Sequence, residues 1–322
     1  PGVATARHAP VVHVAAARAP AVATTTAPPG GRLPVLLKLQ WATGAFGVSL
    51  LMNGISALAL FYLTTVVRLD PATAGFIIFL SRIYDAVTDP LSGWLSDRTQ
   101  SRFGRRRPYL LAGSVVSSLA FVMVFTVPFV GPFESPTSFD ALVASGYVLL
   151  ALLVYTTGYS LFNVPYMAMP AEMTNDYHER SSIHAYRVVF AALGGFAVQA
   201  LAGVLLESIG RDAQGHAALG VVGGVLIAAA MLIAFFGTAR APSLPRSEHR
   251  VPFREQVASF VRNGPFQIVV GVKLLQLIGV SASSGGLVFL LVQVLGKPLT
   301  LLPVIGAATL VGVFVSSPAL VW

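Results

Sequence analysis

The chain has 322 residues, of which 55% are hydrophobic and only 11% are charged, whereas a soluble domain carries about 25% charged residues. This composition excludes an ordinary soluble domain and predicts an all-helical bundle that crosses a membrane several times. The net charge of +8 comes from arginines in predicted loops and not from a nucleic-acid-binding patch, so no nucleic-acid partner is expected. The absence of cysteine excludes disulfides and thiolate metal sites.

Residues 1–35 are rich in Ala, Pro, Thr and Val and contain no acidic residue. This composition is typical of a disordered N-terminal tail. An acid-free leader that contains arginines also fits a transit peptide, which stays open as an alternative.

Eight apolar segments of membrane-spanning length follow the tail. They cover residues 36–67, 72–95, 109–130, 141–169, 188–209, 217–239, 266–295 and 299–322. The first six segments predict an N-terminal transmembrane bundle of six helices over residues 36–239. A basic connection at 240–264, with an amphipathic helix expected at 253–261, is predicted to be a cytoplasmic linker, and 265–322 form a partial second bundle. This layout is typical of a transporter built from two six-helix halves, so we expect a truncated chain with about 8 of 12 helices.

Most of the 21 lysines and arginines lie in the tail and in the loops after the second, fourth and sixth segments. The positive-inside rule therefore predicts a cytoplasmic N-terminus. We expect a monomer in the lipid bilayer of the plasma (inner) membrane.

The second segment carries charges into an apolar stretch, in the run SRIYDAVTDPLSGWLSDRTQSRFGRRRP. Arg82, Asp85 and Asp89 are three or four residues apart, so they share one face of a helix. A charge at membrane depth costs at least about 2.5–3.5 kcal/mol, and such residues usually face a polar cavity. The pattern predicts a cation site inside the bundle. Alternatively, Arg82 and Asp85 merely neutralise each other for packing.

Two stretches together resemble a known family, namely RIYDAVTDPLSGWLSDRTQSRFGRRRP and YSLFNVPYMAMPAEMTNDYHERSSIHAYR. They are similar to the glycoside–pentoside–hexuronide:cation symporters (melibiose-permease-like) of the major facilitator superfamily, and the wider group includes lysophospholipid symporters of animals. The resemblance implies the major facilitator fold and cation-coupled symport of a sugar or glycoside-like solute by alternating access. It implies no enzyme activity and no cofactor apart from the coupling ion, Na⁺ or H⁺.

The resemblance also implies site residues. Asp85 and Asp89 match the aspartates that bind the coupling cation, and their oxygens suit Na⁺, while two like charges one turn apart favour taking up a proton. The expected cation-binding residues are Asp85, Asp89, Ser160 and Asn163. The expected substrate-binding residues are Ser49, Arg82, Tyr159, Asn163 and Arg187.

Two of these positions depart from the family pattern, because Ser49 and Asn163 stand where melibiose permeases carry aspartates. A galactoside is therefore in doubt, and another sugar, a uronide or an amphiphile stays open. Asn163 could instead form a helix–helix hydrogen bond. Pro165 is expected to break or bend the fourth helix beside Asn163, and the nearby tyrosines could stack on a sugar ring or simply pack.

The loop from Gly93 to Arg107 resembles the cytoplasmic gating motif of the superfamily. Gly93 is expected to allow close helix approach, Asp97 to accept an arginine or a helix end, and the arginines to bridge to acids of the other half. Asp176 and Arg180 are spaced to pair on a helix. The expected gating residues are Gly93, Asp97, Arg98, Arg105, Arg106, Glu172 and Arg180. Alternatively, the arginines only anchor the loop to anionic lipid.

Three other functions stay open. The chain could carry a lysolipid or another amphiphile, or it could be an inactive pseudo-transporter. A more remote alternative is a Mg²⁺-dependent membrane prenyltransferase, which also places aspartates on helices. That chemistry needs a second aspartate cluster, and the acid-rich run around Asp176 lies in a predicted loop.

Overall fold

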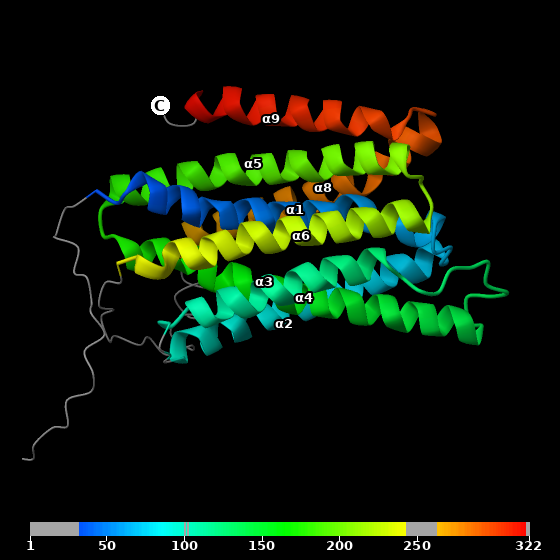
Figure 1. The fold of residues 1–322 in the computed structure, drawn as a ribbon, viewed down its shortest axis with the longest axis horizontal. Coiled ribbons are helices and arrows are strands. Elements are labelled where there is room, and N and C mark those ends of the chain that lie inside the picture. The colour runs from blue at the N-terminus through cyan, green and yellow to red at the C-terminus, as the bar shows by residue number, and fades with distance from the viewer. Residues whose placement is uncertain (1–31, 100, 102, 243–262, 320–322) are drawn as a thin grey trace, which may run out of the picture.

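The computed structural model describes residues 32–319 apart from 100, 102 and 243–262. These residues form eight long helices and no strand, so the predicted all-helical fold is confirmed. The long helices are α1 (Val35–Thr65), α2 (Pro71–Arg98), α3 (Arg107–Phe125), α4 (Phe139–Met173), α5 (Tyr177–Ser208), α6 (Ala213–Gly237), α8 (Gly264–Phe289) and α9 (Leu302–Ala319). Three short helical turns follow α6 and α8, namely η1 (Thr238–Arg240), η2 (Leu290–Val294) and η3 (Leu299–Leu301). The long helices run side by side in one bundle (Figure 1).

Polar side chains begin several of these helices by accepting a hydrogen bond from a backbone amide of the first turn. Asp70 caps α2 in this way, with Pro71 at the first helical position, and Ser138 caps α4. Asp176 caps α5 by accepting from the amide of Glu179 at 2.9 Å. This cap explains why α5 begins at Tyr177 and not near residue 188, where its apolar stretch starts.

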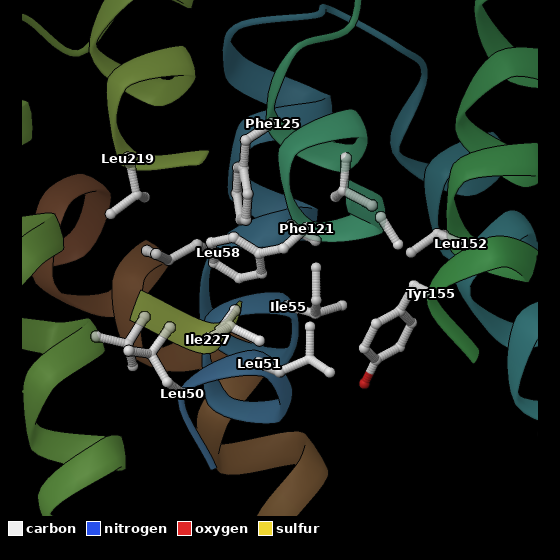
Figure 2. Packing of buried hydrophobic residues seen from close by; sticks show 14 of the residues in the cluster. Leu50, Leu51, Ile55, Leu58, Phe121, Phe125, Leu152, Tyr155, Leu219 and Ile227 are labelled. Atoms are coloured by element: carbon white, nitrogen blue, oxygen red, sulfur yellow. The ribbon is translucent and has the colours of Figure 1, made fainter. Parts of the chain in front are cut away.

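Helix α1 lies at the centre of the bundle and is packed against α3, α5 and α6. Its side chains Leu51, Ile55 and Leu58 meet Phe121 and Phe125 of α3 in the core (Figure 2). Leu219 and Ile227 of α6 complete this side of the cluster. Burial of these side chains therefore fixes the central position of α1.

Small residues allow the closest helix contacts, as is common for helices packed in a membrane. A Cβ atom at Gly54 would lie 2.7 Å from the Phe121 ring, and one at Gly194 of α5 would lie 2.3 Å from the carbonyl oxygen of Phe46. Helices α1 and α5 thus approach each other more closely than a residue with a side chain would allow.

Helices α8 and α9 pack on the outside of the first six helices. Phe289 of α8 meets Phe61 of α1 edge to face, with ring centroids 5.6 Å apart. Figure 1 shows α9 beside α5, where the backbone amide of Leu299 donates to Glu207 at 2.8 Å. The division of the chain at 240–264 stays a prediction, since most of that stretch lies outside the described residues. The amphipathic helix expected at 253–261 and the tail over 1–31 also lie outside them.

Five helices among the described residues are long and apolar enough to cross a membrane, namely α1, α3, α4, α5 and α6 with η1. Helix α2 has 28 residues but carries Arg82, Asp85 and Asp89 along its middle. The charged helix α2 packs against α4, which brings its acidic residues against polar residues of a membrane-spanning helix.

Candidate functional site

The acidic residues of α2 meet a buried hydroxyl of α4. The Ser160 hydroxyl donates to Oδ1 of Asp89 at 2.7 Å and lies 3.4 Å from Oδ1 of Asp85. Thr88 Oγ1 lies 3.2 Å from Ser160 Oγ. Ser160 and Thr88 are buried, and both carboxylates are half-buried. We call these four side chains the α2–α4 oxygen cluster.

The α2–α4 oxygen cluster offers carboxylate and hydroxyl oxygens only. Hard cations such as Na⁺, Ca²⁺ and Mg²⁺ prefer such donors, whereas Zn²⁺ and copper prefer nitrogen and sulfur. No group of three or more His, Cys, Asp or Glu side chains suited to a metal occurs in the part of the chain that the structure describes. The cluster therefore combines two carboxylates with hydroxyls, which suits a singly charged cation better than a strongly bound divalent one.

Arg82 does not neutralise Asp85 by direct contact. The two groups interact electrostatically, but no ion pair within 4.0 Å joins them among the described residues. Arg82 Nη2 instead lies 3.5 Å from the Ser56 hydroxyl of α1, a long hydrogen bond. The packing alternative therefore lacks the contact that it requires, and both carboxylates stay available to another cation.

Asn163 and Tyr159 lie next to the cluster along α4 and bind each other. The Asn163 amide donates to the Tyr159 hydroxyl at 3.0 Å, one turn away on the same helix. The helix–helix bond considered for Asn163 is therefore absent from the described contacts. Tyr84 of α2 does bridge to α4, with its hydroxyl 3.2 Å from Thr157 Oγ1. Tyr166 is buried and stacked on Trp41 at 4.5 Å, so it packs in the core.

Ser49 and Arg187 lie on α1 and α5, outside the α2–α4 oxygen cluster. The Ser49 hydroxyl accepts from the Asn53 amide at 2.9 Å, and a Cβ atom at Gly195 of α5 would lie 3.6 Å from it. Arg187 Nε is buried without a hydrogen-bond partner in the described structure. No hydrogen bond joins either residue to the cluster there, so their role in binding a solute stays a prediction.

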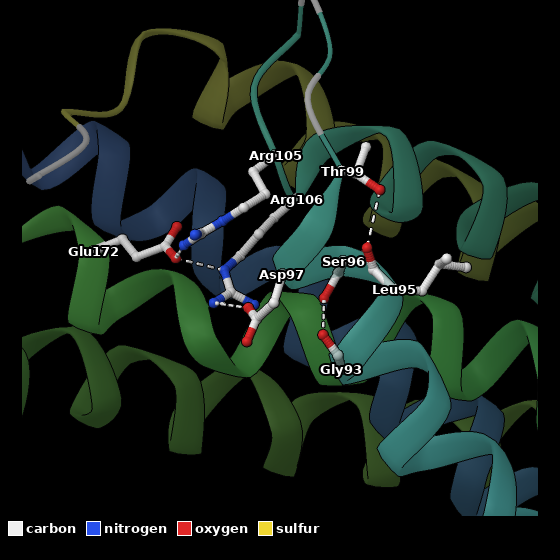
Figure 3. A network of polar contacts seen from close by, with 8 residues as sticks. All are labelled: Gly93, Leu95, Ser96, Asp97, Thr99, Arg105, Arg106 and Glu172. Atoms are coloured by element: carbon white, nitrogen blue, oxygen red, sulfur yellow. Dashed lines mark hydrogen bonds and ion pairs between the residues drawn. The ribbon is translucent and has the colours of Figure 1, made fainter. Parts of the chain in front are cut away.

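Arg106 connects the ends of three helices on the side of the bundle where α2 and α4 finish. It donates from Nη2 to Asp97 at 3.1 Å and from Nε to Glu172 at 2.8 Å. Arg105 binds the same carboxylate oxygen of Glu172. Figure 3 shows these contacts between the end of α2, the start of α3 and the end of α4. We call these four residues the arginine–carboxylate network.

The partners in this network differ from the predicted ones. Arg105 and Arg106 were expected to reach acids of the other half, but they pair within the first six helices. The reason is that α3 begins at Arg107, which places the two preceding arginines beside the last turn of α4. Arg98 lies over the Trp94 ring at 4.0 Å and takes no part in the network. Asp97 does accept an arginine, as expected.

Two further expectations are wrong for local reasons, and a third is wrong in part. Asp176 caps α5 and does not pair with Arg180, which donates to the Thr174 carbonyl at 2.8 Å. The backbone amide of Glu179 lowers the pKa of Asp176. A Cβ atom at Gly93 would lie 3.5 Å from Val164, an ordinary contact that does not require glycine. Helix α4 continues through Pro165, so the expected break is absent, and a bend at this proline stays a prediction.

Sequence reasoning missed two sets of residues. Thr88 stands between the two aspartates of α2, and its position one turn from Asp85 was a signal that could have found it. Lys38 of α1 is buried and bonds to Glu179 of α5 at 2.7 Å and to the Ser182 hydroxyl at 3.1 Å. No local pattern predicts that pair, because it depends on how α1 and α5 meet.

Comparison with known proteins places these features in a family. A family described as MFS/sugar transport protein matches residues 41–322. The chain is 31% identical over 261 residues to the uncharacterized symporter YnaJ of Bacillus subtilis, which covers 79% of this chain and 53% of YnaJ. It is 32% identical to the putative glycoside/cation symporter YagG of Escherichia coli, over 54% of this chain and 36% of YagG.

A relative from an animal is also similar. The sodium-dependent lysophosphatidylcholine symporter 1-B of Danio rerio is 33% identical over 175 residues, which cover 52% of this chain and 31% of the relative. The chain thus spans about half the length, or less, of these curated relatives. The family and the named relatives are transporters, and the long apolar helices agree with that. The chain is therefore an integral, multi-pass membrane protein that belongs to the MFS/sugar transport protein family.

Proposed function

We propose that the protein acts in cation-coupled symport of a sugar or glycoside-like solute by alternating access. The observation that carries this proposal is the α2–α4 oxygen cluster. In this cluster a buried hydroxyl of α4 meets two carboxylates of α2, and no described cation neutralises the carboxylates directly. Two such charges cost free energy inside a membrane unless a cation joins them. The coupling ion would be Na⁺ or H⁺.

The solute would bind beside this cluster. Asn163 and Tyr159 offer an amide and a hydroxyl one turn along α4, and Arg82, Ser49 and Arg187 offer polar groups from α2, α1 and α5. Cation binding would reduce the negative charge next to the solute and so raise the affinity for the solute. By linkage, the solute must then tighten cation binding by the same factor.

The arginine–carboxylate network would serve as the gating element of this cycle. It ties the ends of α2, α3 and α4 together on the side that carries the arginine-rich loops, which we propose to be the cytoplasmic side. Helices bound in this way move as one body when the two halves of a transporter rock. We propose a monomer in the plasma (inner) membrane with a cytoplasmic N-terminus.

Symport of a lysolipid or another amphiphile is the second candidate, and two observations favour it. One relative is named as a lysophosphatidylcholine symporter. In addition, α2 exposes Phe79, Ile83 and Val87 around the charged residue Arg82. An amphiphile could place its head group at Arg82 and its chain along these side chains.

The test is solute-dependent uptake of radioactive Na⁺, or of protons, into liposomes that contain the complete gene product. The solutes are glycosides, uronides and lysophospholipids. We expect one class to drive uptake, and D85N and D89N to abolish it. S160A should raise the half-saturating cation concentration about tenfold, since one hydrogen bond to a charged group contributes about 1.5 kcal/mol.

Asp140→Asn is the matched control, because Asp140 is exposed in the first turn of α4 and forms no described ion pair or hydrogen bond. It should transport like the wild type. Uptake that survives in both D85N and D89N would mean that the aspartates are structural. Absence of uptake with every solute would favour the pseudo-transporter.

A further inference from the structure

A cavity of about 300 Å³ lies at the end of the bundle opposite the arginine–carboxylate network. It is formed by the loop between α1 and α2, the loop between α3 and α4, and the first turns of α4. Its polar lining comes from Arg68, Asp70, Glu134, Ser135 and Ser145. Helices α2 and α4 begin at this cavity and end at the network, so it lies far along the bundle from the gating element. Nothing in the proposed transport mechanism uses it.

Opposite charges line this cavity without meeting. Arg68 and Glu134 form no ion pair or hydrogen bond with each other, or with any other residue among those described. Asp70 adds a second carboxylate, which accepts from the backbone amide of Thr73 at 3.1 Å. The cavity thus holds a guanidinium and two carboxylates that do not pair with each other. It is complementary to a ligand that carries one negative and one positive group.

The backbone holds Arg68 in an unusual conformation. Its φ is 64°, whereas the other residues with positive φ in the described structure are glycines. Such a conformation costs free energy and persists only where the surroundings maintain it. Here the amide of Gly131 donates to the Val67 carbonyl at 3.0 Å and joins the two loops, and the amide of Leu69 donates to Leu63 at 2.9 Å. The cavity is therefore built in advance.

Ser145 supplies an unused hydroxyl to the same cavity. Its Oγ is buried and has no hydrogen-bond partner in the described structure. A serine in a helix commonly bonds to a carbonyl of its own preceding turn, and buried polar atoms are nearly always bonded. This hydroxyl is therefore free to bond to a ligand in the cavity.

The cavity lining includes the apolar residues Leu69 and Phe133, and further apolar side chains near it in the sequence are exposed. Phe139 and Leu142, in the first turn of α4, are 78% and 57% exposed, and Phe129 and Val130 in the preceding loop are also exposed. This is the end of helices that cross the membrane, where lipid head groups and acyl chains meet. A ligand with a charged head and an apolar tail thus finds charged and apolar side chains at the same end of the bundle.

We propose that this cavity binds a zwitterion with one phosphate and one primary ammonium, as phosphatidylethanolamine carries. The phosphate binds Arg68 and the Ser145 hydroxyl, and the ammonium binds Glu134 and Asp70. Phosphatidylcholine has no N–H group to donate to the carboxylates, and phosphatidylglycerol has no cation for them. Both lipids should therefore bind more weakly.

Native mass spectrometry of the purified protein, titrated separately with the three lipids in detergent, tests this proposal. We expect about tenfold tighter binding of phosphatidylethanolamine, the difference expected from one charge-assisted hydrogen bond. E134Q should remove that preference, because it removes a carboxylate that the ammonium binds, whereas R68G should weaken the binding of all three lipids, because each of them carries the phosphate. Glycine adopts the φ of Arg68 freely, so R68G should fold, and an unchanged melting temperature checks this.

Asp140→Asn is again the control, since it removes a nearby exposed carboxylate outside the cavity, and it should keep the preference. Competition by free O-phosphoethanolamine would identify the head group alone as the ligand, whereas a preference that it does not affect would identify the intact lipid. Equal binding of the three lipids, a preference unchanged in E134Q, or lipid binding unchanged in R68G would overturn the proposal.

Discussion

Replacing Glu172 by glutamine removes the charge that Arg105 and Arg106 bind through one carboxylate oxygen. The side chain of Arg106 is only 9% exposed and that of Glu172 is 26% exposed, so water compensates little for the loss. A hydrogen bond to a charged group contributes about 1.5–3 kcal/mol. We therefore expect E172Q to destabilise the protein by about 2 kcal/mol.

The Asp97→Asn substitution should cost less, about 1 kcal/mol or below. Asp97 is 39% exposed in its pair with Arg106, and pairs near the surface contribute little. In addition, Arg106 keeps its ion pair with Glu172 in this variant. The melting temperature in detergent, followed by tryptophan fluorescence, measures the difference, and 2 kcal/mol corresponds to a decrease of roughly 4–8 °C.

A double-mutant cycle of Arg106→Gln with Glu172→Gln isolates the pair itself. We expect a coupling energy of about 1.5 kcal/mol or more. The same cycle with Asp140→Asn in place of the glutamate change should give none. A decrease in melting temperature for E172Q no larger than that for D140N, or a coupling energy of zero, would refute the reasoning.

Two further predictions concern stability. Gly194→Ala should destabilise the protein by several kcal/mol, because its Cβ would lie 2.3 Å from the Phe46 carbonyl oxygen. Gly146→Ala, which has open space around it, should instead stabilise α4 by up to about 1 kcal/mol. Equal melting temperatures of the two variants would contradict the packing described. Asp176→Ala should lower the melting temperature at pH 7, and by less at pH 3. The folded state lowers the pKa of Asp176, so its contribution is full above the unfolded value of about 4 and is lost as the pH falls through the folded value. A difference that is the same at both pH values would exclude this role.

The positions of Asp85 and Asp89 could be predicted because their shared face depends only on helix geometry. The buried contact of Ser160 with both depends on the register of α4 against α2, which no local pattern specifies. The resemblance to a family nevertheless named that serine. The start of α5 was missed although Asp176 and Glu179 carry the signature of a helix N-terminus.

Charge partners were the least predictable feature. Arg106 could have paired with any acid near the ends of the helices, and its pairing with Glu172 depends on where α3 starts and α4 stops. The buried pair of Lys38 with Glu179 likewise depends on the close approach of α1 and α5. Helix packing, and not spacing along the chain, decides such contacts.

The Ser160 hydroxyl carries a single hydrogen, yet two carboxylates and the Thr88 hydroxyl surround its oxygen. That hydrogen can serve one acceptor at a time, and the distances of 2.7 and 3.4 Å assign it to Asp89. The two aspartates are therefore not equivalent. In the transport cycle proposed above, Asp85, which keeps more of its lone pairs unfilled, would be the first to receive an arriving cation, and Asp89 would join when the hydroxyl turns away.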